Sequence, residues 1–468
     1  MTPEPTGVTL LVTGGDVVTM NATRDVLVGG AVLIDGDVIA AVGSTSVLTA
    51  EHPDATVFDA SGCVVIPGLI DAHAHQTGSA LGRCCGSDLK TSGEQIFGWA
   101  VPFHGGHDAD DDELSATLCA VEALTNGITT VVEAGTVNHY DRVAQGMQRA
   151  GIRGTVGTWG WDVEGVPYSL PAGEALARQA ELLDRFPRST PAAPRLVEGW
   201  VTLVGHDLCS DELMAGAADL ARSRGTSMTM HLSPTSSDPE SYLARTGKRP
   251  AVHLHDLGVL GDHLLLGHGV WLDEAEIELI LATRTAIAYC PWAYLKMGQG
   301  VLANGRHFEI HDRGGRIALG CDGVGHAPMD ILGVATLAAG IARDRNIDPL
   351  RFGAHQAFEL ATIAGAEAIG MSDRIGSLEV GKQADLVVHA TDNAMWTPRG
   401  DVGMQLIWGT DGRTVRDVFV AGRQVVAGGA ATMVDAAELA AQAAEQQSAL
   451  FARAGLNPQP TWPHLDSH

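Results

Sequence analysis

Two histidines separated by one residue give this sequence its clearest chemical signal. His73 and His75 end the segment Pro67–His75, which reads PGLIDAHAH and follows the apolar run Cys63–Ile66. Alternate side chains of a β-strand share one face, so both imidazoles are expected to point the same way. Two imidazoles on one rigid face favour a transition metal such as Zn, Fe or Co. A chance surface pair is the alternative, so the rest of the chain must supply further ligands.

Further ligand-type side chains stand at the ends of other strand-like runs. His231 comes near the end of one apolar run, His268 ends Leu264–His268, and Asp322 follows Arg316–Cys321. Each residue taken alone is more typical of an ordinary buried or loop position. Their shared placement favours one site, because three imidazoles and a carboxylate suit one divalent transition metal with an open position for water.

The composition narrows the class of partner. The 468 residues include 30 Lys and Arg against 56 Asp and Glu, which gives a net charge of −26. A protein this acidic is repelled by nucleic acids and anionic membranes, so a small neutral or cationic substrate is expected. No basic leader and no apolar run of membrane-spanning length is found, and a cytoplasmic location is expected. The seven cysteines are scattered and predict reduced thiols: Cys63, Cys84, Cys85, Cys119, Cys209, Cys290 and Cys321.

The middle of the chain alternates strand-like and helical segments. Helices are predicted over Asp112–Asn126, Ala172–Phe186 and Asp211–Arg224. The eight predicted strands are Cys63–Ile70, Thr129–Glu133, Gly154–Thr158, Leu196–Leu203, Ser227–Leu232, Leu264–His268, Thr285–Cys290 and Arg316–Cys321. This pattern predicts an α/β protein with a (β/α)8 TIM barrel, whose active site collects at the carboxyl ends of the strands. A doubly wound sheet is disfavoured because no Gly-x-Gly-x-x-Gly turn opens a helix.

Both ends of the chain carry short strands separated by turn residues, as in Val38–Val42 and Val415–Val420. A small composite β-sandwich built from both chain ends is therefore expected beside the barrel. The predicted domains are residues 1–66 and 373–430 for the two parts of the sandwich, 67–372 for the barrel, and 431–468 for a C-terminal helix and tail.

Five segments together resemble the amidohydrolase superfamily, in its branch of ring aminohydrolases and triazine chlorohydrolases. Within that branch the chain is similar to hydrolases of thiocarbamate and phenylurea herbicides, such as molinate hydrolases. The resemblance covers nearly the whole chain and implies a TIM barrel. The segments are Pro67–His75, Gly267–Val270, Cys290–Ala293, Leu319–Gly323 and Gly376–Leu386.

The resemblance also implies a homo-oligomeric, metal-dependent hydrolase of a small molecule. His268 would hydrogen-bond the bound water or the substrate carbonyl, and Asp322 would also take the proton of that water. No lysine lies in Leu196–Leu203, where two-metal relatives carry one, so one divalent metal per chain (Co, Zn, Mn or Fe) is expected. The implied metal ligands are His73, His75, His231 and Asp322.

One departure from the family pattern guides the choice of substrate. Ring deaminases of this branch carry His-x-x-Glu after the fifth strand, but here Pro234 stands three residues after His231. That glutamate protonates the ring or the leaving amine, whereas a thiolate, from a thiol of pKa roughly 8.5 to 10, leaves without an acid. The leading expectation is therefore hydrolysis of a thiocarbamate, carbamate or urea by metal-bound hydroxide, most closely a molinate-like thiocarbamate. Asp238 or Glu240 could replace the acid from a loop.

Two other functions stay open. A deaminase or chlorohydrolase of a nitrogen heterocycle, such as a purine, pyrimidine or s-triazine, would use the same ligands. A catalytically inactive barrel serving as a structural subunit is disfavoured, because all five site residues are present. His104 and His107 lie in a glycine-rich stretch that is read as a solvated loop rather than a pocket mouth. Six aromatic residues are equally typical of a substrate wall or of core packing: Trp99, Phe103, Trp159, Trp161, Trp292 and Tyr294.

Overall fold

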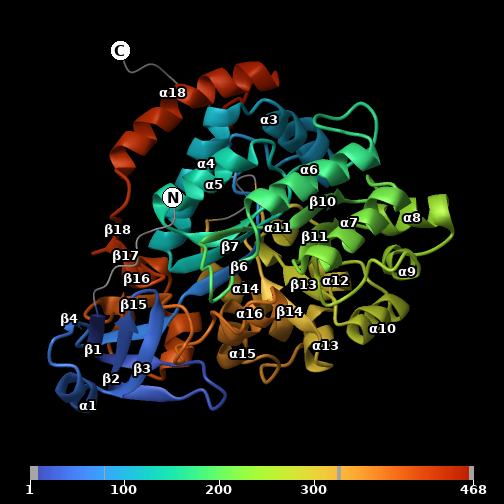
Figure 1. The fold of residues 1–468 in the computed structure, drawn as a ribbon. Helices are drawn as coiled ribbons and strands as arrows, with labels where there is room; N and C mark the ends of the chain where they lie inside the picture. The colour runs from blue at the N-terminus through green and yellow to red at the C-terminus, as the bar shows by residue number, and fades with distance from the viewer. Residues whose placement is uncertain (1–8, 79, 324–327, 463–468) are drawn as a thin grey trace.

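A computed structural model describes residues 9–78, 80–323 and 328–462. A barrel of parallel strands, wrapped by helices, occupies most of the molecule, and a mixed β-sheet lies against one side of it (Figure 1). The two chain ends meet in this sheet, because its strands come from residues before 68 and after 385. The predicted TIM barrel with a composite domain is thus confirmed.

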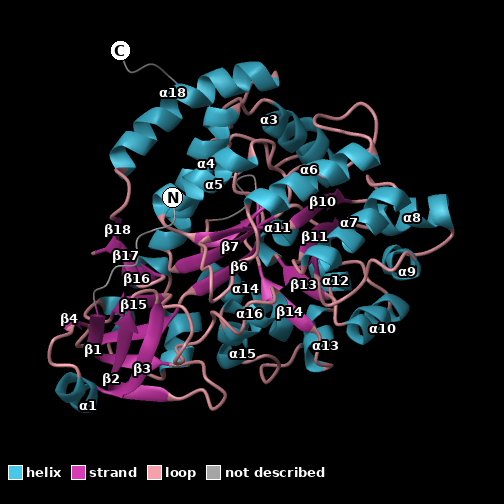
Figure 2. Ribbon diagram, in the orientation of Figure 1, coloured by secondary structure: helices cyan, strands magenta, loops and turns pink. Residues whose placement is uncertain are grey.

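The barrel wall is formed by parallel strands at the centre of the helical layer (Figure 2). The predicted fourth strand is broken at Trp200 into two segments, β9 and β10, and the others follow the predicted order. The strands are β6 (Leu69–Ala74), β7 (Ile128–Glu133), β8 (Arg153–Val156), β9 (Val197–Gly199), β10 (Val201–Gly205), β11 (Met228–Leu232), β12 (Leu264–His268), β13 (Ala286–Tyr289) and β14 (Arg316–Leu319).

Helices separate most of these strands along the chain, and α18 follows the last strand of the mixed sheet. The helix predicted from Asp112 begins at Ala109, because the Asp108 side chain accepts hydrogen bonds from the backbone of Asp110 and Asp111 and so caps the first turn. The longer helices are α4 (Ala109–Thr125), α5 (Tyr140–Ala150), α6 (Ala172–Arg185), α7 (Asp211–Arg224), α8 (Ser237–Thr246), α10 (Glu274–Thr283), α14 (Ile331–Asn346), α15 (Ala354–Ala361) and α18 (Ala436–Ala454). The shorter ones are α1 (Thr45–Glu51), α2 (Ser92–Gln95), α3 (Val101–Gly105), α9 (Pro250–Asp256), α11 (Pro291–Lys296), α12 (Val301–Asn304), α13 (His307–Asp312), α16 (Ile363–Ala368) and α17 (Val402–Met404).

The first predicted barrel strand, Cys63–Ile70, is two strands rather than one. Its first half, β5 (Cys63–Pro67), pairs with strands of the mixed sheet, and only β6 enters the barrel. The chain changes direction at Gly68, where a Cβ atom would lie 2.0 Å from the Thr129 Oγ1 atom of β7. Only glycine allows the two strands to approach this closely.

The mixed sheet joins the two chain ends through the antiparallel pairing of β5 with β15. The domain boundaries given above remain predictions. The strand order is β18-β17-β16-β15-β5-β1-β2-β3, with β4 beside β1. The remaining bounds are β1 (Thr9–Val18), β2 (Val26–Asp35), β3 (Val38–Ser44), β4 (Thr56–Asp59), β15 (Leu386–Ala390), β16 (Val415–Val420), β17 (Arg423–Ala427) and β18 (Ala430–Ala431).

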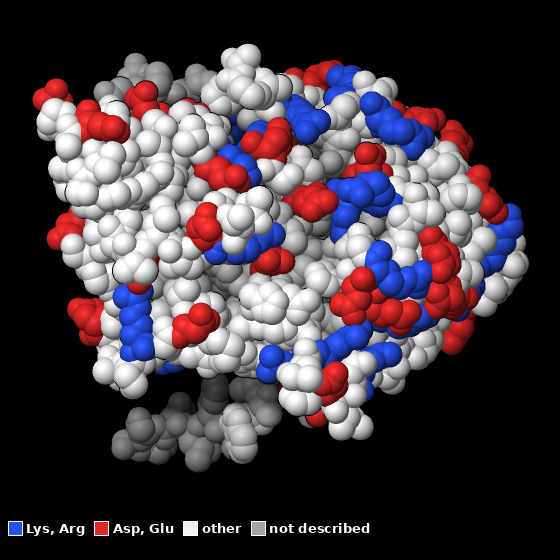
Figure 3. Space-filling view, turned by 90° about the horizontal axis from the view of Figure 1, so that it is seen from below, with Lys and Arg blue, Asp and Glu red and all other residues white. Residues whose placement is uncertain are grey.

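The C-terminal helix α18 packs over α3 and α4 at the top of Figure 1. Its Phe451 ring lies 5.7 Å from Trp99 and 6.1 Å from Phe103, so these two aromatic residues contribute to a buried cluster under the helix. Among the described residues, no helix combines the length and the apolar character needed to cross a membrane. Figure 3 shows acidic and basic side chains interspersed on the face drawn.

A buried ion pair ties the barrel to the mixed sheet. Arg153, at the start of β8, donates two hydrogen bonds to the Asp385 carboxylate, at 2.7 and 3.0 Å. The two side chains are only 5% and 3% exposed. Asp385 also accepts a bond from the Ala421 backbone N–H at 2.7 Å. The Asp385 carboxylate, directly before β15, therefore links the start of β8 to the residue that follows β16.

We expect Arg153→Met to destabilise the fold by about 3–5 kcal/mol, because it leaves the Asp385 charge buried without its cationic partner. Chemical denaturation measures the change. The matched control is Arg413→Met, since the Arg413–Asp411 pair lies at the surface and its loss is expected to leave the unfolding midpoint unchanged. Equal midpoints for both variants would show that the buried pair does not join the two parts.

Candidate metal centre

The seam that closes the barrel brings the first and last strands together at the predicted site. The Asp322 backbone N–H donates to the His73 carbonyl at 2.8 Å, and the His75 N–H donates to the Asp322 carbonyl at 3.4 Å. Below this seam, one Asp71 carboxylate oxygen accepts bonds from the backbone of both His73 and Cys321, at 3.0 and 3.1 Å. Burial raises the pKa of Asp71 to about 7, against the opposing effect of these hydrogen bonds.

The five predicted site residues meet in one buried cluster. The His73 ring lies 5.4 Å from His75, 4.8 Å from His231 and 5.1 Å from His268, measured between ring centroids. The His75 and His231 Nε2 atoms are 3.3 Å apart. Asp322 places one carboxylate oxygen 3.4 Å from His75 Nε2 and the other 4.0 Å from His268 Nε2. Neighbouring strand ends therefore supply a convergent set of nitrogen and oxygen donors.

The electrostatics of the cluster favour the neutral form of three imidazoles and the charged form of the carboxylate. Burial lowers the pKa of His73, His231 and His268 well below the ordinary value. Burial alone would raise the pKa of Asp322, but the hydrogen bond with His75 and the nearby imidazoles hold it well below its usual range. The same carboxylate raises the pKa of His75 against the effect of burial. Neutral imidazole and ionised carboxylate are the forms that bind metal.

Hydrogen bonds outside the cluster orient two of the rings. His231 Nδ1 donates to the Val204 carbonyl at 2.7 Å, and His75 Nδ1 shares a hydrogen bond of 2.8 Å with Thr136 Oγ1. Thr136 Oγ1 lies 3.5 Å from the buried Glu133 carboxylate, which also accepts the Thr136 N–H at 3.2 Å. Such bonds fix the tautomer and leave Nε2 for a metal.

The residues present fit a transition metal. Both ring nitrogens of His73 are buried without a hydrogen-bond partner, which is costly for a polar group unless another ligand satisfies it. The close approach of the His75 and His231 Nε2 atoms also needs a proton or a cation between them. The donors of His73, His75 and His231 lie within 4.8 Å of one another, as do those of His73, His268, Cys290 and Asp322. This set matches a divalent transition metal.

Sequence reasoning missed three contributors to the site. Glu133 is the last residue of β7, and Thr136 follows three residues later. A glutamate at the end of the apolar run Ile128–Glu133 is a pattern that could have identified Glu133 as a site residue. His206 directly follows β10, and its ring stacks on His231 with centroids 4.9 Å apart. A lone histidine between a glycine and an aspartate gave no signal, because only the barrel geometry brings it to the other imidazoles.

The interpretation of His104 and His107 as a solvated loop is wrong. Both side chains are buried, and His104 belongs to α3. The His104 ring lies 6.2 Å from His75 and 5.7 Å from Trp159, and its Nδ1 atom is 3.2 Å from Thr77 Oγ1. The glycine-rich composition suggested an exposed loop. The segment instead folds as short helical turns that pack under α18.

The two acids that follow Pro234 differ in position. Glu240 is exposed, whereas Asp238 is buried. Asp238 accepts the Ser233 backbone N–H at 2.8 Å and faces His206 Nδ1 at 3.2 Å. Of the two residues, only Asp238 therefore stands beside the cluster.

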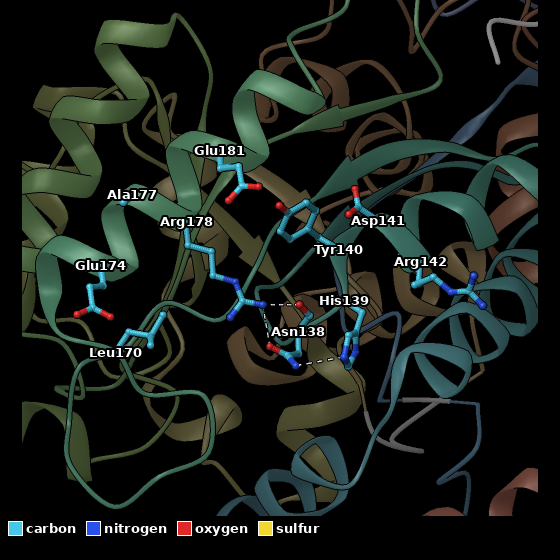
Figure 4. Close-up of a pocket in the computed structure, with 10 residues that line it drawn as sticks. All are labelled: Asn138, His139, Tyr140, Asp141, Arg142, Leu170, Glu174, Ala177, Arg178 and Glu181. Carbon is cyan, nitrogen blue, oxygen red and sulfur yellow. Dashed lines mark hydrogen bonds between the residues drawn. The ribbon is translucent and has the colours of Figure 1, made fainter.

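A surface cavity of about 660 Å³ lies apart from this centre, and no predicted site residue lines it. Figure 4 shows Arg178 of α6 pointing across it toward Asn138. It is lined by Asn138, His139, Tyr140, Asp141, Arg142, Leu170, Glu174, Ala177, Arg178 and Glu181.

The sequence matches the amidohydrolase family over residues 64–425. The chain belongs to this family. Residues 30–55 also match the imidazolonepropionase-like composite domain of bacteria, which agrees with the mixed sheet. An amidohydrolase of this fold with a cluster of metal-binding side chains is a metal-dependent hydrolase, as predicted.

Several relatives narrow the class of amidohydrolase. A 5-methylthioadenosine/S-adenosylhomocysteine deaminase of Symbiobacterium thermophilum is 32% identical, over 84% of this chain and 88% of that protein. Its counterpart from Syntrophobacter fumaroxidans is 30% identical, over 89% and 92%. An adenosine deaminase structure from Xanthomonas campestris with bound zinc superposes with a TM-score of 0.87 at 26% identity, covering 96% of this chain and 100% of that one.

These relatives contradict the prediction of thiocarbamate, carbamate or urea hydrolysis. All three are deaminases, and none is a herbicide hydrolase. The prediction was wrong because it gave the proline at position 234 more weight than the open alternative that Asp238 or Glu240 replaces the acid.

We expect the purified amidohydrolase to hold about one transition metal per chain, and the His73→Ala, His75→Ala double variant to lose it. Removing two of four ligands leaves too few donors for tight binding. Elemental analysis of gel-filtered protein measures the content, and His355→Ala, at an exposed histidine, is the control. Full metal retention in the double variant would overturn the ligand assignment, and two tightly held metals would overturn the single-metal site.

Proposed function

We propose that this amidohydrolase is a deaminase of an adenosine-type nucleoside, replacing the exocyclic amino group of the purine with oxygen and releasing ammonia. The observation that carries the proposal is the buried Asp322 carboxylate, whose two oxygens face His75 Nε2 at 3.4 Å and His268 Nε2 at 4.0 Å, in a chain whose relatives are named as deaminases of adenosine derivatives. A deaminase needs such a carboxylate to accept the proton of the attacking water.

Aromatic side chains around the cluster suit a planar heterocycle. The Trp159 ring stacks on Trp161 at 4.7 Å, and Tyr294 meets His268 edge-on at 5.5 Å. The Trp159 indole N–H is buried without a protein partner, so it is able to donate to a ring nitrogen or a ribose oxygen. Apolar walls with a few polar groups are typical of small-molecule sites.

Each residue of the cluster has a role in this reaction. His73, His75, His231 and Asp322 would hold the metal, which when bound makes water a better nucleophile at neutral pH. Asp322 accepts a proton from the attacking water. His268 faces the same carboxylate and hydrogen-bonds the incoming oxygen, which orients it toward the purine carbon. The buried setting keeps bulk water away from these charges.

The donor set and one relative indicate which metal the site would hold. We propose zinc as the metal, since nitrogen and carboxylate donors suit zinc and the Xanthomonas campestris adenosine deaminase carries it. A cytoplasmic location and a homo-oligomeric state remain predictions from the sequence. A small-molecule substrate agrees with the relatives.

We expect metal-loaded protein to release ammonia from adenosine, 5′-deoxyadenosine, 5-methylthioadenosine or S-adenosylhomocysteine. Coupled ammonia detection and mass spectrometry of the inosine-type product measure the reaction, with metal-free protein as the control. No ammonia from any of these nucleosides, under conditions where the metal is fully bound, would contradict the proposed function.

We expect His268→Ala to keep its metal and to lower kcat by about 10²–10³-fold, the usual cost of removing one preorganised donor. His268→Gln should recover part of the rate, because an amide N–H can still donate. Metal analysis and steady-state kinetics separate the possible roles. Loss of the metal would make His268 a ligand, and unchanged kcat would remove it from the mechanism.

A further inference from the structure

The roles given above for the metal-centre residues include no proton donor for the amino group that leaves during nucleoside deamination. The amino group must be protonated before it departs, because an amide anion is far too basic to leave. In ring deaminases of this branch a glutamate takes part in that step, but here Pro234 occupies its position. An apolar ring at 234 neither donates nor accepts a proton. Another side chain beside the metal centre must therefore supply it.

His206 lies beside the metal centre. Its ring stacks on His231 at 4.9 Å and lies 6.4 Å from His268, with interplanar angles of 27° and 18°. Its side chain is 16% exposed, so the ring borders accessible space beside the cluster. Its backbone is left-handed, with φ of 56°, a conformation of higher energy that holds the side chain at the strand end.

Asp238 fixes the orientation of this ring. Its carboxylate is 6% exposed and accepts the Nδ1–H of His206 at 3.2 Å. The Ser233 backbone N–H donates to the same carboxylate oxygen at 2.8 Å, so the loop that carries Pro234 also positions Asp238. With Nδ1 bonded to Asp238, Nε2 is the ring nitrogen that is left for a ligand. In His–Asp pairs of this kind the carboxylate holds the imidazole in one orientation.

We propose that the His206–Asp238 pair replaces the missing glutamate and protonates the leaving amino group; this inference rests on the proposed deaminase function. His206 Nε2–H donates its proton to the amino nitrogen as the C–N bond breaks, and ammonia leaves. The water oxygen forms the new bond to carbon. One water proton passes to Asp322 and ends on the ring nitrogen of the product, and the other replaces the proton that His206 gave. His206 is then a catalytic residue and Asp238 a positioning residue.

The test compares two leaving groups on one purine ribonucleoside, an amino group and a chloride at the same carbon. Chloride departs without a proton, so only the amino substrate depends on the donor. We expect His206→Ala to lower kcat for the amino substrate by about 10²–10⁴-fold and to leave the chloro substrate far less affected. Asp238→Asn should show a smaller loss with the same selectivity, because an amide still accepts the Nδ1–H bond but carries no charge.

Two further variants complete the test. Asp256→Asn, in the exposed His255–Asp256 pair, is the matched control and should leave both rates unchanged. Adding Pro234→Glu to His206→Ala should restore the amino substrate selectively. Metal content is measured for every variant.

Equal losses on both substrates, or loss of metal from His206→Ala or Asp238→Asn, would show a structural role and overturn the inference. Unchanged rates would also overturn it. A wild-type protein that releases chloride but deaminates no adenosine derivative would instead contradict the proposed function, so the two failures are distinct.

Discussion

The site depends on the closure of the barrel between β6 and β14. The hydrogen bond from the Asp322 N–H to the His73 carbonyl joins a histidine and a carboxylate that are distant in sequence. The Asp71 carboxylate reinforces the seam by holding the backbone of His73 and Cys321. A metal centre needs its donors fixed within a few tenths of an ångström, and a closed ring of parallel strands provides that rigidity.

Holding these side chains costs free energy that the rest of the fold must offset. His206, His268 and Asp322 all have left-handed backbone conformations, at φ of 56°, 89° and 65°. Each such position costs on the order of 1–3 kcal/mol and persists only where the surroundings determine it. The unpartnered nitrogens of His73 add a further penalty. These three left-handed residues and the unpartnered His73 ring lie together at the carboxyl ends of the barrel strands, which is the edge where barrel enzymes bind their ligands.

The sequence was sufficient for the barrel, the composite domain and the five converging side chains, because strand periodicity and strand-end placement are local signals. The sequence was insufficient where a feature depends on contacts between segments that are far apart in the chain. The apolar run Cys63–Ile70 looked continuous, although the close approach at Gly68 divides it between two sheets. The glycine-rich segment around His104 looked solvated, although α18, more than 300 residues later, covers it.

The substrate class was misjudged for the same reason. A linear motif treats the fifth strand and its glutamate as one unit, so Pro234 reads as a lost function. A barrel presents the ends of all its strands to one space, and the chemistry asks only that a proton donor reach that space. His206 enters from the fourth strand, and Asp238 returns from the start of α8 to hold it. For the proposed deamination, the leaving amine needs a proton donor at one place in the site, and we infer that residues from two different elements together supply it.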